Sequence, residues 1–378
     1  MGADADRPLR GAVVGLRHGH IGSVDRASPG GQRGLLGTFS QIPQVQLVAL
    51  CESDPALLER EGAALPGARR FGAPEALLDY GEFDFALVGL PAVELPGVAA
   101  ALLRQGKHCF LEKSIARTAE EFRPVLDAAA ASGAHCLVDF PWRFHPALAT
   151  MRELLDSGAL GRPLMVAAQM VTTQVGSGPG QRNPQHPAYR PETEGGGMLH
   201  WLGQHFLEVL SFLGGDVRQV SAMCAPVVGN MAPDPRMDDV SVLALRFASG
   251  AMGALHVGYL NAAGGANRDV VHLWGSEGDA YWPGLGPQLV VNSRAPSWAG
   301  SPTRSYEFTL RPRAGVYGNS EWMFQVAVDF VRGIRAGRPP AVGPAEAMRV
   351  LQLTDAAYAA SASQRWVSLP ETPRDASR

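Results

Sequence analysis

The chain has 378 residues, of which 46% are hydrophobic and 18% charged, and its formal net charge is −3 at pH 7. This length is natural for two domains, and the composition supports a sizeable buried core rather than a disordered chain. A slight negative charge argues against nucleic-acid binding, which needs a basic surface. No apolar run is long enough to cross a membrane, and the polar N-terminal residues lack the apolar core of a signal peptide. We therefore expect a cytoplasmic protein with no nucleic-acid or membrane partner.

Four cysteines are spread along the chain, at Cys51, Cys109, Cys136 and Cys224. Three of them lie inside apolar runs with strand character, so we expect buried, reduced thiols. No pair has the CxxC spacing of a structural zinc site, and the histidines are scattered. We therefore expect no metal site.

The first half of the chain alternates short apolar strands with helices. Strands are predicted at residues 11–16, 45–51, 84–90, 107–111 and 135–140, and helices at 55–65, 95–105 and 119–131. Such an order predicts a parallel sheet covered on both faces, and we assign residues 8–140 to a Rossmann dinucleotide-binding domain. Residues 22–44 carry a Ser-Pro-Gly-Gly sequence and lengthen the first crossover, and we predict a loop and part of a helix there.

The second half has a different order of predicted elements, with consecutive strands joined by short turns. A helix is predicted at 151–157, and three glycines at 195–197 precede a helical segment at 198–213. Strands are predicted at 217–228, 240–248, 251–259, 270–274, 288–291 and 305–310, followed by helices at 320–336 and 344–363. The fold class is therefore α/β, with a C-terminal α+β domain at 141–370 that contains a large, mostly antiparallel open sheet. We expect a homo-oligomer, dimer or tetramer, through that sheet, and the C-terminal helices can pack back on the first domain.

The first predicted strand leads into a glycine-rich turn, Gly-Leu-Arg-His-Gly-His-Ile-Gly at residues 15–22. Such a turn can place backbone N–H groups against a pyrophosphate, but Arg17 stands where the strict GxGxxG pattern has glycine. A phosphate loop and a plain tight turn are both compatible with this sequence. Glu52, after the second strand, either accepts hydrogen bonds from ribose hydroxyls or is a solvated carboxylate at a strand end.

Two further residues are candidates for chemistry. Lys113 follows the fourth predicted strand, at the sheet edge where ligands bind, and it either stabilises a substrate oxygen or is a surface lysine. His205 shares a predicted helical face with Trp201 at i−4 and Glu208 at i+3, whereas His200 lies off that face. His205 is either a proton shuttle or a core histidine.

Taken together, these segments resemble the Gfo/Idh/MocA oxidoreductases, the superfamily of glucose–fructose oxidoreductase and inositol dehydrogenase. The resemblance extends over most of the chain and several motifs occur in the family's order. They are AALLRQGKHCFLEKSIA at 100–116, RFHP at 143–146, RELLDSGALG at 152–161, GGGMLHWLGQH at 195–205, LWGSEGD at 273–279 and WVSLP at 366–370.

The resemblance implies roles for particular positions. Lys113 and His205 match the catalytic lysine and the acid/base histidine. Glu52 matches the acidic position that binds ribose. The other implied cofactor-binding positions are Gly15, Arg17, His18, Gly19, His20, Ile21, Leu90, Pro91, Glu112 and again Lys113, and the implied substrate-binding positions are Trp201, Arg190, His200 and Glu208.

The chain departs from the family pattern at several positions. Besides Arg17, Ser114 replaces a proline, Leu95 replaces a histidine common in the family, and Trp201 stands where sugar and polyol dehydrogenases have aspartate. The expected activity is NAD-dependent hydride transfer from a hydroxyl-bearing carbon of a sugar, cyclitol or related metabolite. An NAD-retaining lyase or glycosidase and a non-catalytic sensor are the alternatives. NAD is expected to be preferred over NADP, because Glu52 is followed by Ser53 and Asp54 with no arginine there to receive a 2′-phosphate.

Overall fold

The computed structural model describes residues 7–22, 34–172, 190–228, 236–260, 267–284 and 286–371. The chain divides into two compact units, one formed by Met1–Phe144 with Leu310–Met348 and the other by His145–Thr309 with Arg349–Arg378. The sequence-based boundaries were 8–140 and 141–370, with C-terminal helices free to pack on the first domain. The structure places the segment Leu310–Met348 in the first unit. Among the described residues, no helix combines the length and hydropathy needed to span a bilayer.

The first unit contains a six-stranded sheet in which every neighbouring pair of strands is parallel. The order is β3-β2-β1-β4-β5-β6, that of a doubly wound dinucleotide-binding fold. The prediction of a parallel sheet is confirmed, although the sequence missed one short strand. The strands are β1 (Leu9–Val14), β2 (Val45–Cys51), β3 (Arg69–Phe71), β4 (Phe85–Val88), β5 (His108–Leu111) and β6 (Cys136–Val138).

Helices cover this sheet, and local sequence sets where they begin and end. The Asp54 side chain accepts hydrogen bonds from two backbone N–H groups at the start of α2, and Thr118 accepts one at the start of α5. Gly133 ends α5 with a φ of 65°, which favours glycine. The helices are α1 (Leu35–Ser40), α2 (Pro55–Ala63), α3 (Pro74–Tyr80), α4 (Leu95–Arg104) and α5 (Ala119–Ser132). The helix predicted within residues 22–44 is therefore α1, and 23–33 lie outside the described residues.

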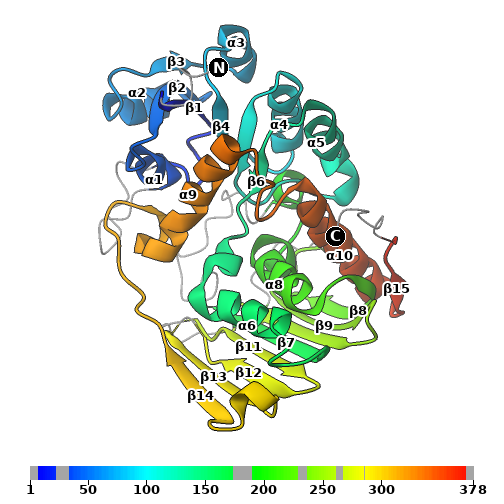
Figure 1. Cartoon of the computed structure of the whole chain (residues 1–378). Helices are drawn as coiled ribbons and strands as arrows, with labels where there is room; N and C mark the ends of the chain where they lie inside the picture. The colour runs from blue at the N-terminus through cyan, green and yellow to red at the C-terminus, as the bar shows by residue number, and fades with distance from the viewer. Residues whose placement is uncertain are drawn as a thin grey trace. The chain divides into compact units, whose positions relative to one another are not determined.

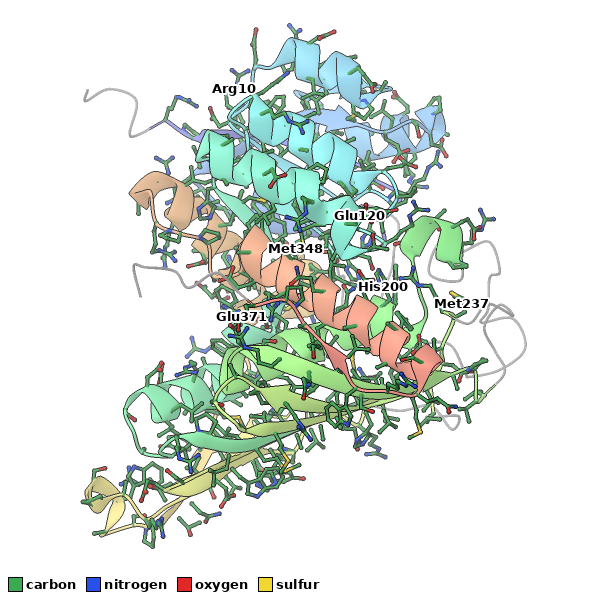
Figure 2. The ribbon with its side chains drawn as sticks, turned by 90° about the vertical axis from the view of Figure 1, so that its right-hand side faces the viewer. Arg10, Glu120, His200, Met237, Met348 and Glu371 are labelled. Carbon is green, nitrogen blue, oxygen red and sulfur yellow. The ribbon has the colours of Figure 1, made fainter. Side chains whose placement is uncertain are left out.

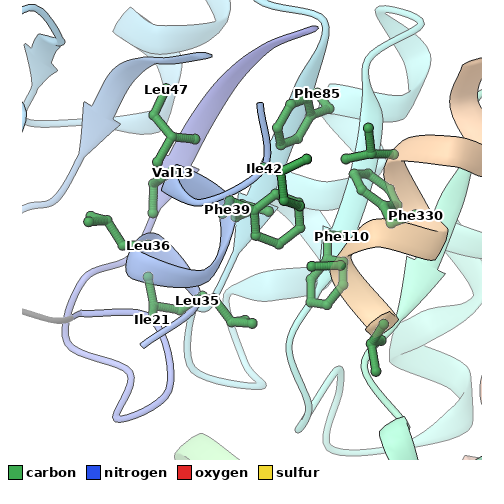
Figure 3. Packing of buried hydrophobic residues seen from close by; sticks show 14 of the residues in the cluster. Val13, Ile21, Leu35, Leu36, Phe39, Ile42, Leu47, Phe85, Phe110 and Phe330 are labelled. Atoms are coloured by element: carbon green, nitrogen blue, oxygen red, sulfur yellow. The ribbon is translucent and has the colours of Figure 1, made fainter. Parts of the chain in front are cut away.

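A cluster of aromatic rings explains why a late segment belongs to the first unit. Phe330, on α9 (Glu321–Ala336), lies with its ring centroid 5.6 Å from Phe85 and 5.5 Å from Phe110. Phe39 of α1 completes the cluster, as Figure 3 shows, and all four rings are fully buried. Figure 1 shows α9 beside α1. Burial of this much aromatic surface fixes α9 to the sheet.

The second unit is built on a nine-stranded sheet of order β14-β13-β12-β11-β7-β10-β9-β8-β15. Its pairs are antiparallel except β10 with β7, which confirms the predicted mostly antiparallel sheet. The sequence missed β7, β12 and β15. The strands are β7 (Pro163–Val171), β8 (Val217–Ala225), β9 (Val240–Phe247), β10 (Met252–Gly258), β11 (Val270–Gly275), β12 (Gly278–Trp282), β13 (Gln288–Ser293), β14 (Thr303–Glu307) and β15 (Val367–Ser368).

Helices cover one face of this sheet, and among the described residues the other face carries exposed side chains such as those of Met223 and Met252. Figure 1 shows α6 (Pro146–Asp156) and α8 (Gln204–Gly214) on the covered face. Strand β9 alternates buried and exposed residues along its length, as a strand covered on one face should. The unit also contains α7 (Pro191–Glu194), the π-helical turn η3 (Leu199–Gly203) and the part of α10 (Pro344–Ser363) from Arg349 onward. All four cysteines are free thiols, three of them buried, as expected.

Candidate functional site

The turn after β1 is packed too tightly for side chains. Gly15 has a φ of 83°, and a Cβ there would lie 2.3 Å from the carbonyl oxygen of Gly89, which follows β4. A Cβ on Gly89 would lie 2.2 Å from Cγ1 of Ile21 in the same turn. The strand order reverses between β1 and β4, and this is where doubly wound sheets bind nucleotides. The turn therefore lets backbone approach backbone at the expected position, with Leu90 and Pro91 half-buried beside it.

The missing fingerprint glycine at Arg17 is tolerated because its side chain points outward, with 63% of it exposed. Glu52 holds this part of the turn. Its Oε2 accepts hydrogen bonds from the backbone N–H groups of Leu16 at 2.8 Å and Arg17 at 3.2 Å. Glu52 is therefore a buried structural carboxylate as well as a candidate ribose ligand, and it is not the solvated strand-end residue of the alternative interpretation.

The structure corrects the expectation that no arginine stands near Glu52. The Nε atom of Arg17 lies 3.2 Å from Oε1 of Glu52, and a second guanidinium nitrogen donates a hydrogen bond to Oγ of Ser53 at 3.3 Å. The sequence interpretation missed this because Arg17 lies 35 positions before Glu52. The carboxylate beside it neutralises the cation.

Lys113 is buried rather than on the surface, since only 1% of it is exposed. It follows β5 at the carboxyl edge of the sheet, and its peptide bond to Ser114 is cis. Two buried acids, Glu112 and Asp139, interact electrostatically with the charge of Lys113 and with each other. Burial raises the pKa of Glu112 to about 7, against the lowering effects of Asp139 and the Lys113 charge. Burial and the neighbouring Glu112 raise the pKa of Asp139 well above its usual range.

Two histidines of the glycine-rich turn adjoin these acids. His20 Nδ1 makes a short contact with Oε1 of Glu112, and His20 Nε2 lies 3.0 Å from the hydroxyl of Tyr317. Nδ1 of His18 accepts a hydrogen bond from the backbone N–H of His20 at 3.3 Å. Possible metal-ligand atoms of His18, His20 and Glu112 lie within 4.8 Å of one another. A zinc ion bound at about 2.0–2.2 Å from each of these atoms would bring them closer together than this. Both ring nitrogens of His20 already have hydrogen-bond partners, so we treat this as a hydrogen-bonded cluster.

The buried acids predict how stability depends on pH. The folded-state pKa of Glu112, about 7, exceeds its ordinary value of 4.5, so the folded protein keeps a proton that the unfolded chain loses. The stability from this group is present below pH 4.5 and is lost as the pH rises through 7, a loss on the order of 3 kcal/mol. Glu112→Gln should flatten this slope, and Glu82→Gln, at an exposed ion pair with Arg10, should not. Denaturant unfolding at several pH values measures it, and an unchanged slope in Glu112→Gln would refute the assignment.

In the second unit, the three glycines that precede the histidine-bearing helix are each required sterically. Gly195 has a φ of 92° and ends α7. A Cβ on Gly196 would lie 2.6 Å from the hydroxyl of Tyr358, on α10. A Cβ on Gly197 would lie 2.0 Å from the carbonyl oxygen of Asp238. The glycines thus let the chain pass closely beside two other segments before the helix begins.

Asp238 anchors that helix and was missed by sequence analysis. Its carboxylate is fully buried and accepts hydrogen bonds from the backbone N–H of Leu199 at 3.0 Å, the Ser241 hydroxyl at 2.7 Å and the Tyr358 hydroxyl at 2.7 Å. The Leu199 bond fixes the first residue of η3. Asp238 stands beside Asp239 in an Arg-Met-Asp-Asp sequence. Nothing in that sequence distinguishes the two aspartates, and only the hydrogen bonds in the folded structure identify Asp238 as the anchor.

The candidate substrate residues fall on two kinds of helix. His205 and Glu208 lie in α8 and are buried, whereas Trp201 lies in the π-helical turn and is half-buried. The argument that placed all three on one face assumed a regular α-helix, which the chain adopts only from Gln204 onward. His200, labelled in Figure 2 beside the ribbon of α10, is fully buried and its Nδ1 lies 3.3 Å from Nε2 of Gln204.

Arg190 lies at the start of α7, where its carbonyl oxygen accepts hydrogen bonds from the backbone N–H groups of Thr193 and Glu194, both at 3.0 Å. Its proposed contact with substrate stays a prediction. Residues 173–189, which precede it, lie outside the described part of the chain.

Comparisons with known proteins agree with this two-domain fold. Residues 10–140 match the profile of the oxidoreductase family with an NAD-binding Rossmann fold, and residues 148–281 match the GFO/IDH/MocA C-terminal domain. Levoglucosan dehydrogenase of Pseudarthrobacter phenanthrenivorans is 23% identical, over 85% of this chain and 89% of that protein. Inositol 2-dehydrogenase 2 of Saccharopolyspora erythraea is 26% identical, over 59% of this chain and 62% of its own length.

Solved structures show the same fold. A complex of levoglucosan dehydrogenase with NADH and L-sorbose superposes with a TM-score of 0.80 at 20% identity, covering 97% of this chain and 100% of the other. An oxidoreductase from Agrobacterium radiobacter, in complex with NAD+, L-tartaric acid and magnesium, gives a TM-score of 0.79 at 18% identity, covering 95% and 98%. The chain therefore belongs to the Gfo/Idh/MocA family of oxidoreductases, with an NAD-binding Rossmann fold and the family's C-terminal domain.

Proposed function

We propose that this protein is an NAD-dependent dehydrogenase that acts on a hydroxyl-bearing carbon of a sugar, cyclitol or related polar metabolite. The observation that carries the proposal is the burial of Lys113 and of the adjacent Glu112 at the carboxyl edge of a dinucleotide-binding sheet. The substrate class is supported by relatives named levoglucosan dehydrogenase, inositol 2-dehydrogenase 2 and D-apiose dehydrogenase. The glycine packing at the switch point of the sheet fits NAD.

Each proposed role follows from the chemistry of a side chain. NAD, when bound, supplies the hydride acceptor. Lys113 stabilises negative charge on the substrate oxygen as the carbonyl forms, and its buried ammonium is balanced by the Glu112–Asp139 pair. His205 accepts the hydroxyl proton.

The remaining candidates are assigned to substrate binding. Trp201 offers an indole face to a ring-shaped substrate, because a half-buried aromatic ring has both a packed and an accessible side. Glu208, buried three residues after His205, is the carboxylate proposed to replace the family's aspartate. Arg190 and His200 complete the proposed set.

A panel assay tests the proposal. The protein is mixed with NAD and with anhydrosugars, pentoses, inositols or amino sugars, and absorbance at the NADH band is followed. Mass spectrometry of the denatured protein reports any cofactor that co-purifies. NADH accumulation with one of these compounds is expected. Conversion of substrate without NADH accumulation, by protein that already contains NAD, would instead favour the NAD-retaining lyase.

Cofactor choice is predicted to depend on Glu52. The wild-type protein should bind NAD more tightly than NADP, because the Glu52 carboxylate neutralises Arg17 and repels a 2′-phosphate. Glu52→Gln frees the Arg17 cation next to the Ser53 hydroxyl, so the preference for NAD should fall by about tenfold or more. Calorimetry with both cofactors measures the ratio, and Glu59→Gln, an exposed acid on α2, is the control. An unchanged ratio in Glu52→Gln would show that Glu52 does not set the preference.

We further infer that a second copy of this chain covers the open face of the large sheet. Met223 and Met252, on that face, are 69% and 60% exposed, and Val242 lies on β9 between their strands. Met223 and Val242 are paired across β8 and β9, and exposed apolar residues on a sheet face favour association with a complementary face. Met252→Lys should therefore lower the mass measured by light scattering, whereas Leu260→Lys, an exposed apolar position after β10, should not. A monomeric wild-type protein would contradict the inference.

We also infer the cytoplasmic location expected from the sequence. Four free cysteines suit a reducing compartment. Burial raises the pKa of Cys51 and Cys136 to about 12, which keeps these thiols protonated and unreactive.

A further inference from the structure

The segment that carries Tyr317 is fixed to the first unit at several points. The backbone N–H of Tyr317 donates a hydrogen bond to Oγ1 of Thr38 on α1 at 2.8 Å, and Val316 is fully buried in the core. Gln41, just after α1, donates a hydrogen bond to the carbonyl oxygen of Ala314 at 2.9 Å. The Tyr317 side chain therefore projects from a well-anchored backbone.

From this anchor, the Tyr317 hydroxyl reaches the glycine-rich turn. It lies 3.0 Å from Nε2 of His20, and the centroids of the two rings are 4.4 Å apart. The other ring nitrogen of His20 contacts Glu112, which interacts electrostatically with the buried Asp139. A series of polar contacts thus joins the Leu310–Met348 segment to residues that follow β1 and β5.

Lys113 depends on the position of these acids. A buried ammonium is stable only beside a compensating negative charge, and the charge of Lys113 acts on both Glu112 and Asp139. Glu112 is the residue before Lys113. A change in the orientation of Glu112 therefore changes the backbone conformation next to Lys113 and the electrostatic potential at its ammonium group. The imidazole of His20, with 27% of its side chain exposed, is held against Glu112 by Tyr317.

We propose that Tyr317 is a positioning residue for the reaction, which orients His20, and through it Glu112, so that Lys113 is held in its working position. This rests on the catalytic role proposed for Lys113. A further ionisable group beside His20 is His18, whose ring centroid lies 5.0 Å away. Nothing in this arrangement requires Tyr317 to touch substrate or cofactor.

The first test needs neither substrate nor turnover. NMR spectra of cofactor-free protein with labelled histidine and lysine report the ring nitrogens of His20 and the ε-carbon of Lys113. Tyr317→Phe removes one hydroxyl and keeps the ring. We expect both sets of resonances to shift in Tyr317→Phe. Neither should shift in the control Tyr80→Phe, which removes a hydroxyl that accepts a hydrogen bond from Arg10 near the start of β1, away from the carboxyl edge of the sheet. An unmoved Lys113 resonance would overturn the proposal, and so would zinc found in the purified protein by elemental analysis with His20 as its ligand.

The second test separates positioning from folding. We expect Tyr317→Phe to lower kcat about tenfold, the scale of one lost hydrogen bond, with KM for substrate changed less than twofold and the melting temperature lowered by no more than about 4 °C. If Tyr317→Phe fails to fold, His20→Asn breaks the same series of contacts at its more exposed residue. It should also lower kcat about tenfold with little change in KM for substrate. A kcat within twofold of wild type in both variants would overturn the proposal. If no compound is turned over, the dehydrogenase proposal fails, and the NMR result still decides whether Tyr317 controls the environment of Lys113.

Discussion

Lys113→Ala is expected to lower kcat by about 10²–10³-fold, the loss seen when one group that stabilises a developing oxyanion is removed. The ammonium is buried, so water cannot easily take its place. Binding of NAD should change little, because Glu52 holds the glycine-rich turn through the backbone N–H groups of Leu16 and Arg17. Steady-state kinetics and calorimetry measure the two effects.

Lys107→Ala is the matched control. Lys107 lies just before β5, at the opposite end of the strand from Lys113, and its ammonium donates hydrogen bonds to the carbonyl oxygens of Gly81 and Phe83. Its loss should affect stability and leave kcat near the wild-type value. If Lys113→Ala raises only KM for substrate, Lys113 binds substrate and transition state equally and the proposed role is wrong. Unaltered biological output from Lys113→Ala would favour a non-catalytic sensor.

Asp238→Ala is expected to lower the free energy of unfolding by about 3–5 kcal/mol, since three buried donors lose their acceptor. These donors are the Leu199 N–H and the hydroxyls of Ser241 and Tyr358. The folded fraction should also lose activity, because the anchored helix carries His205. Denaturant unfolding and kinetics per folded molecule measure these effects.

A graded series strengthens this test. Asp238→Asn keeps one acceptor oxygen and should cost less than Asp238→Ala, and Ser241→Ala, which removes one donor, should cost about 1 kcal/mol. Asp238→Ala within 1 kcal/mol of wild type would mean that the hydrogen bonds of Asp238 do not hold the helix.

The strands of the first sheet were predictable because buried parallel strands are continuous apolar runs. The run at 45–51 gave β2 with its correct limits. The missed strand β3 has only three residues, two of them arginines, and pairs only with β2 at the sheet edge. Strand β7 was missed because the apolar residues of 163–171 do not alternate with polar ones, although their burial does alternate.

The site was predictable where a motif lies within one segment, and not where residues meet across the chain. The glycine-rich turn and the Glu-Lys pair at 112–113 are local patterns. Tyr317 meets His20 across 297 positions, and Tyr358 meets Asp238 across 120. Neither tyrosine stands in a distinctive sequence, and only packing of α9 and α10 brings them there. The contact between Arg17 and Glu52 was not predicted for the same reason, because the two residues are 35 positions apart in the sequence.

Transfer of deuterium tests the central proposal most directly. A sugar or cyclitol that the panel assay identifies is prepared with deuterium on its reacting carbon and incubated with the protein and excess NAD. The account predicts that NADH recovered free in solution carries one deuterium, in an amount equal to the oxidised product. Product formed without deuterated NADH in solution would contradict it.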